Sequence, residues 1–180
     1  MSLNYKEINV ILEELALGGS RIDKINQPDR FSLYLETYGN KRKQKILISL
    51  THGAVRIHRI HLKPEFPPTP PRFTQLLRAR IKGGRIISLS QPENERILQF
   101  IIQTQDKIQH LWCRLWSGNP NLILTDENFV IIDTLFRKRG IIEFAGEIFN
   151  PDFSLFKKNN KKIITVRTNN SHENFNDFIN

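Results

Sequence analysis

The feature that most constrains the fold of this chain is a short sequence that occurs twice. Gly18–Pro28 reads GGSRIDKINQP and Gly83–Pro92 reads GGRIISLSQP, and the Arg-Ile and Gln-Pro pairs each return after 64 residues. A helical pattern precedes each Gly-Gly pair, and a strand-like pattern follows each Gln-Pro pair. We therefore expect two similar α-β-β units, residues 5–60 and 70–132, with the Gly-Gly pairs ending helices and the Gln-Pro pairs between strands.

Apolar periodicity divides the chain into two helices and many short strands. Helices are expected at Ile8–Leu15 and Arg72–Ile81, where apolar residues share one face. Strands are expected at 20–26, 30–37, 45–50, 54–60, 85–90, 96–103, 107–116, 121–125 and 129–135. Short strands separated by turns favour an α+β fold, a two-layer β-sandwich of two α-β-β halves with flanking helices. Residues 1–150 are expected to form the domain, and 151–180 a linker or tail with a short strand at 162–167.

The positive charge is concentrated in the middle of the chain. The net charge is +9, and residues 41–96 hold 13 Lys and Arg against 3 acids. Such a basic block favours a nucleic-acid partner over a solubilising surface. The second helix and its exit carry five of these cations, which suggests a groove for RNA; they are Arg72, Arg78, Arg80, Lys82 and Arg85. Arg80 lies in the apolar sector of that helix, so it extends to solvent, pairs with a buried acid or points into a ligand groove.

The histidines form one cluster in the sequence, consisting of His52, His58 and His61. No cysteine or acid lies near them at metal-ligand spacing, so we expect no metal site. Together with Arg56 and Arg59, they are expected to form part of a rim that faces phosphate.

The sequence lacks the motifs of an enzyme. It contains no glycine-rich phosphate loop, no Ser-His-Asp arrangement and no paired carboxylate motif, so we expect no catalytic residues and no cofactor. The single cysteine, Cys113, lies in an apolar strand and is interpreted as a core residue. Because there is neither a long apolar run nor a signal-peptide pattern, we expect a cytoplasmic protein without a membrane partner.

Five strings together resemble the N-terminal domain of the NFACT family, whose members include bacterial fibronectin-binding protein A and RqcH and eukaryotic NEMF. They cover most of residues 18–135, in the family's order and spacing. The strings are Gly18–Pro28, Leu47–Ile60 (LISLTHGAVRIHRI), Pro70–Gln91 (PPRFTQLLRARIKGGRIISLSQ), Glu95-Arg96-Ile97 and Ser117–Leu135 (SGNPNLILTDENFVIIDTL).

The resemblance implies a fold like the N-terminal domain of formamidopyrimidine-DNA glycosylases. It also implies tRNA binding beside an obstructed large ribosomal subunit, in ribosome-associated quality control, where full-length members help add an alanine tail to the stalled chain. An Asp-Arg pair of the family serves tRNA recognition and matches Glu95 and Arg96 here. A second family acid matches Asn4, which is neutral. Further family domains do not fit in 180 residues, so a longer protein is expected.

Two other functions stay open at this point. The family's older label suggests an adhesin, with fibronectin as a candidate partner, although the missing signal pattern and lack of disulfides speak against it. The implied fold suggests, more remotely, a DNA glycosylase-like repair protein. Those enzymes attack with the amine of an N-terminal proline, whereas Ser2 and Leu3 follow Met1 here.

Overall fold

The computed structural model describes residues 3–92, 94–105, 107–137 and 143–150. This part of the chain contains two helices, α1 (Tyr5–Leu15) and α2 (Arg72–Ile81). It also contains nine strands: β1 (Arg21–Asn26), β2 (Ser32–Gly39), β3 (Arg42–Ser49), β4 (Arg56–Arg59), β5 (Arg85–Ser90), β6 (Ile97–Thr104), β7 (Lys107–Arg114), β8 (Asn121–Asp126) and β9 (Ile131–Thr134). The expected linker or tail at 151–180, including the short strand at 162–167, lies outside the described residues.

Each helix forms where the sequence places an apolar stripe. The helix α1 begins with a capping box, in which Asn4 and Glu7 satisfy each other's backbone N–H groups, and it buries Ile8 and Leu15. It ends at Ala16, which has a left-handed φ of 44°, so this helix stops before the Gly-Gly pair that we expected to end it. The bounds of α2 agree with the prediction, and it buries Phe73, Thr74, Leu77 and Ile81.

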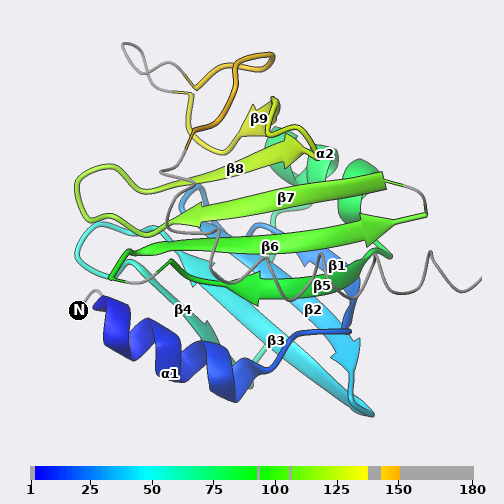
Figure 1. Cartoon of the computed structure of the whole chain (residues 1–180). Helices are drawn as coiled ribbons and strands as arrows, with labels where there is room; N and C mark the ends of the chain where they lie inside the picture. The colour runs from blue at the N-terminus through cyan, green and yellow to red at the C-terminus, as the bar shows by residue number, and fades with distance from the viewer. Residues whose placement is uncertain (1–2, 93, 106, 138–142, 151–180) are drawn as a thin grey trace, which may run out of the picture. The chain divides into compact units, whose positions relative to one another are not determined.

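All strands pair antiparallel in one nine-stranded sheet, in the order β4-β3-β2-β1-β5-β6-β7-β8-β9. The α+β class is thus confirmed, but the expectation of two separate sheets is corrected, because β1 and β5 join the halves through a single residue pair, Arg21↔Arg85. From this junction the halves diverge and cross, with β1–β4 behind β5–β8 in Figure 1. They share one hydrophobic core that also includes residues of both helices. The likeness to glycosylases stays a prediction.

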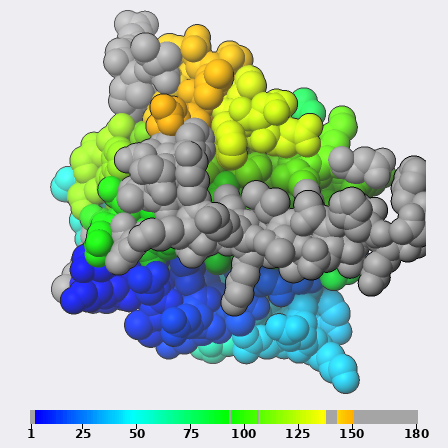
Figure 2. Space-filling model, viewed as in Figure 1, coloured from blue at the N-terminus to red at the C-terminus, as the bar shows by residue number. Residues whose placement is uncertain are grey.

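The internal duplication is confirmed within the predicted bounds, and each unit contains one helix and four strands rather than the two strands of an α-β-β unit. The first strands start 64 residues apart, at Arg21 and Arg85, and the next three pairs start 65 residues apart. The pairing with the following strand shifts at the same place in both halves, after Ile22 in β1 and after Ile86 in β5. In Figure 2 the blue and cyan first half lies below, and the green and yellow second half above.

The junction between the halves is reciprocal. The backbone N–H of Gly19 donates to the carbonyl of Ile86 at 2.8 Å, and that of Gly83 donates to the carbonyl of Ile22, also at 2.8 Å. Gly19 and Gly83 have positive φ values of 81° and 82°, which glycine adopts without strain. A second reciprocal pair of bonds lies beside the first (Ile22 N to Gly84 O, 2.9 Å; Ile86 N to Ser20 O, 2.8 Å). These bonds define a pseudo-twofold axis between β1 and β5.

Next to this axis, one glycine in each half packs tightly against a side chain of the neighbouring segment. In the first half this glycine is Gly39, at the end of β2, and in the second half it is Gly84, directly before β5. A Cβ on Gly39 would lie 2.2 Å from Ser20 Oγ, and a Cβ on Gly84 would lie 2.7 Å from Thr104 Cγ2. By the repeat, Ser20 corresponds to Gly84, and Gly39 corresponds to Thr104. Each half therefore keeps one side chain and one glycine at this contact.

Two further observations concern the interior. Cys113 is fully buried in the shared core, as predicted, and burial raises the pKa of its thiol. Neither helix of the described chain is long and apolar enough to cross a membrane.

Candidate nucleic-acid interface

The amide of Gln91 brings together two segments that the sequence separates by about half the chain. Its Nε2 donates to the carbonyl of Tyr5, at the start of α1, at 3.2 Å, and also to the carbonyl of Glu95. Gln91 itself is only 8% exposed. The start of α1, which follows Asn4, and the backbone of Glu95 therefore meet at this one amide.

Asn4 is exposed, and its side chain caps α1. Its Oδ1 accepts from the backbone N–H groups of Lys6 and Glu7 at 2.9 and 3.0 Å. Asparagine and aspartate cap a helix about equally well. The change to a neutral residue therefore preserves the start of the helix while removing one negative charge from the site.

Arg96 lies directly before β6 and is half-buried, as is Glu95. Its Nη1 donates to Ser117 Oγ at 3.1 Å, and its carbonyl accepts from the N–H of Leu115 at 2.7 Å. Its Nε and Nη2 are enclosed and have no hydrogen-bond partner among the described residues. The guanidinium therefore has two donors that no described protein group uses.

Gln27, the counterpart of Gln91 in the first half, contacts the helix of the second half. It is buried, and its Oε1 accepts from Thr74 Oγ1 in α2 at 3.1 Å. Each Gln-Pro glutamine thus binds the first turn of the helix that belongs to the other half. The repeated motif therefore links the two halves internally, and an acid-arginine pair follows each copy, Asp29-Arg30 in the first half and Glu95-Arg96 in the second.

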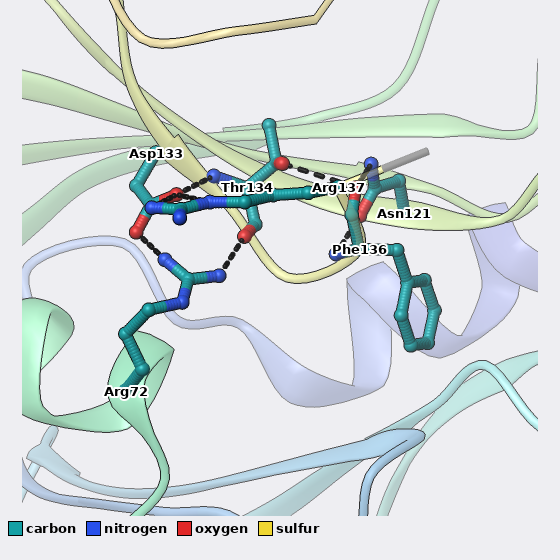
Figure 3. Close-up of polar contacts among 6 residues, drawn as sticks. All are labelled: Arg72, Asn121, Asp133, Thr134, Phe136 and Arg137. Atoms are coloured by element: carbon teal, nitrogen blue, oxygen red, sulfur yellow. Dashed lines mark hydrogen bonds and ion pairs between the residues drawn. The ribbon is translucent and has the colours of Figure 1, made fainter. Parts of the chain in front are cut away.

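Arg72, which the sequence placed in the RNA groove, anchors α2 to the last strand. It pairs with the buried carboxylate of Asp133 and donates to the carbonyl of Thr134 at 2.7 Å (Figure 3). Arg137 approaches the same carboxylate at 3.2 Å. Burial, followed by the charge of Arg137, lowers the pKa of Arg72. Arg72 therefore has a structural role that its position in the sequence did not reveal.

Arg78 also makes a bond within the protein, because its Nε donates to the carbonyl of Ile25 at 2.8 Å, near the end of β1.

Arg56 and Arg59 are exposed on β4, an edge strand that β3, β2 and β1 separate from β5. Burial and the neighbouring charge of Arg56 lower the pKa of His58 on that strand. The basic block is thus divided into internal anchors, a β4 rim and the cations near α2.

The cations near α2 line a groove of about 620 Å³ at the C-terminal end of that helix. Arg80 is exposed and lines this groove, and it forms no ion pair with the described residues, so the alternative of a buried acid as its partner is not supported. Arg85 lines it too, together with Lys107 and Gln109, which sequence reasoning missed. Both missed residues occupy repeat positions equivalent to Arg42 and Gln44, so aligning the two halves would have brought them to attention. No three metal-ligating side chains gather among the residues that the structure describes.

Comparisons with known proteins agree with one another. A family model described as NFACT N-terminal and middle domains matches residues 6–141. The chain is 36% identical over 131 residues to the Rqc2 homolog RqcH of Bacillus subtilis, covering 69% of this chain and 23% of that protein. It is 32% identical over 150 residues to ribosome quality control complex subunit 2 of Saccharomyces cerevisiae, covering 81% and 14%.

Among solved structures, the N-terminal part of the fibronectin/fibrinogen-binding protein from Streptococcus suis matches with a TM-score of 0.72 and 26% identity. The match covers 77% of this chain and 57% of that one. The chain therefore spans about a quarter or less of the two curated relatives.

Proposed function

The chain belongs to the NFACT family, matching its N-terminal region, and from this premise we propose that it is a non-catalytic RNA-binding module that recognises tRNA at obstructed large ribosomal subunits. The relatives named above are ribosome quality control factors, which supports a role in that process. Within the longer protein, the module would serve the alanine tailing of stalled nascent chains. The large ribosomal subunit and tRNA are its proposed partners.

The observation that carries this proposal is the pair of bonds from the Gln91 amide, which link the start of α1, directly after Asn4, to the backbone of Glu95. The guanidinium of Arg96, which is half-buried and bonded to Ser117, is a group that suits a phosphate or an unpaired base. The carboxylate of Glu95 suits the exocyclic amino groups of bases and repels phosphate. A pair of opposite charges in this arrangement can discriminate among RNA surfaces, whereas lysines alone would bind any polyanion.

Binding of fluorescent tRNA by the Arg96→Ala variant tests the proposal. We expect the variant to lose about 1–3 kcal/mol of binding free energy, and Glu95→Ala to lose selectivity among tRNAs more than total affinity. Lys63→Gln is the control, since Lys63 is an exposed cation outside the site that lies over the ring of Phe66. Wild-type affinity in Arg96→Ala, together with a large loss of folding stability, would show that the pair is only a structural link.

Fibronectin binding is the second candidate function, because the Streptococcus suis neighbour is called a fibronectin/fibrinogen-binding protein. Immobilised fibronectin should retain the chain if this function is shared. If retention disappears in moderate salt, it reflects the net charge of +9 rather than a specific interface.

A further inference from the structure

The groove at the end of α2 has the composition of an anion site. Among the residues that the structure describes, its lining includes no acid and four exposed cations, which come from α2 and its exit, β5 and β7: Arg80, Lys82, Arg85 and Lys107. None of the four forms an ion pair with another residue in the described part of the chain. Cations gathered around a concave surface without internal partners attract phosphate groups.

In the first half of the molecule, side chains of the protein occupy the space that is equivalent to this groove. Arg42 and Gln44 are the repeat counterparts of Lys107 and Gln109. The Nε2 of Gln44 donates to the carbonyl of Leu15 at 2.8 Å, and Arg42 approaches the same carbonyl at 3.4 Å. These side chains therefore close the space at the end of α1. Their counterparts make no such bond to α2 among the described residues, and the space stays open.

A second comparison between the halves points the same way. Arg21 and Arg85 face each other across the pseudo-twofold axis. In the first half, Asp23 neutralises Arg21 through a bond of 2.8 Å from Nε to Oδ1. The residue at the equivalent position in the second half is Ile87, so Arg85 has no acid beside it on its strand. The second half has kept the cation and lacks its internal partner.

Gln109 supplies a polar group at the base of the groove. Its side chain is only 4% exposed, and its Oε1 has no hydrogen-bond partner in the described chain. It also lines an adjoining hollow of about 360 Å³, together with Arg80, Lys107, Asp126 and Glu127. A buried amide oxygen normally accepts a hydrogen bond, and here a ribose 2′-hydroxyl or a water molecule in the groove would be a suitable donor, whereas a phosphate oxygen would not.

We propose that this groove binds backbone phosphates of an RNA strand, as a second RNA contact distinct from the Glu95-Arg96 site. The inference extends the proposed function and rests on it for the identity of the polymer. Arg85 begins β5 and Gln91 follows its end, so the two contacts lie about 20 Å apart along an extended strand. A short stretch of RNA is long enough to span this distance.

The test uses the whole chain, a short oligouridine as probe and the double variant Lys82→Gln/Lys107→Gln. Losing two phosphate contacts should weaken oligouridine binding by about tenfold or more at low salt and reduce the log-log salt slope by about 1.4. Lys63→Gln should change the slope little, because Lys63 lies outside the groove. In an NMR titration, the side-chain amide of Gln109 should shift in the wild-type chain and not in the double variant.

The outcomes separate this inference from the proposed function. If Arg96→Ala weakens tRNA binding and the groove variant does not, the groove inference is wrong while the function stands. If oligouridine shifts Gln109 but no tRNA is preferred over other RNA, the groove contact is supported and tRNA recognition fails. Inorganic phosphate producing the same saturable shift at similar concentration would show a simple anion site and overturn the assignment to RNA.

Discussion

The contact beside the pseudo-twofold axis gives a stability prediction that depends only on the repeat. Replacing Gly84 with serine places a Cβ 2.7 Å from Thr104 Cγ2 and 2.8 Å from Ile102 Cγ2. Both neighbours are β-branched, so neither methyl group moves away easily. We expect Gly84→Ser to lower the free energy of unfolding by about 2–3 kcal/mol, the usual range for overpacking.

The first half indicates how the loss is repaired, because Ser20 lies opposite Gly39 there. Thr104→Gly alone should cost about 1 kcal/mol through lost packing and a more flexible unfolded chain. In the double variant Gly84→Ser/Thr104→Gly, the serine has the glycine partner that Ser20 has. Recovery should be partial, since Ile102 still crowds the new Cβ. The expected coupling energy is about 1 kcal/mol or more in favour of the double variant.

Urea unfolding of the wild type, both single variants and the double variant gives the four free energies of unfolding of a double-mutant cycle. The coupling is read from the four free energies of unfolding, provided that the m-values agree. If the double variant were as unstable as the sum of the single variants, the equivalence of Ser20–Gly39 and Gly84–Thr104 would be refuted, and with it the pseudo-twofold description of this contact.

Two further predictions concern buried charge. Arg72→Gln should reduce the free energy of unfolding by about 1–2 kcal/mol, because it removes a partner from the buried carboxylate of Asp133, and thermal melts should show the loss. Burial lowers the pKa of His110 to about 4, so between pH 6.5 and 4 the unfolded chain binds a proton that the folded chain does not. Stability should therefore fall by about 2 kcal/mol from pH 7 to pH 5 in urea titrations, and His110→Gln should flatten that part of the profile.

The repeat was predictable because most of the residues that form the junction between the halves are the same in both copies. Gly19, Gly83 and the two Gln-Pro glutamines hold positions that few other residues could fill, so their spacing carries information about the fold. The single sheet was not predictable, because it depends on a few backbone bonds at Arg21↔Arg85, and backbone bonds leave little trace in side-chain pattern.

The candidate site was predicted in part. Glu95, Arg96 and Asn4 came from the family resemblance, and no spacing rule could have shown that Gln91 holds them together. The sequence analysis assigned Arg72 and Arg78 to an RNA groove. A helical wheel shows on which face of a helix a cation lies, but it does not show which group the cation binds. Their partners, Asp133 and the carbonyl of Ile25, lie far away in the sequence.

The reciprocal junction has a consequence for how the two halves divide their tasks. A contact in which residue i meets j and j meets i is the form of an isologous dimer interface, here contained within one chain. In a true homodimer, any groove at the end of the helix would occur twice and be identical in both copies. Covalent linkage removes that constraint. One copy can then specialise in stability, with Gln44 closing its helix end, while in the other copy Lys107 and Gln109 line the groove that we propose for RNA.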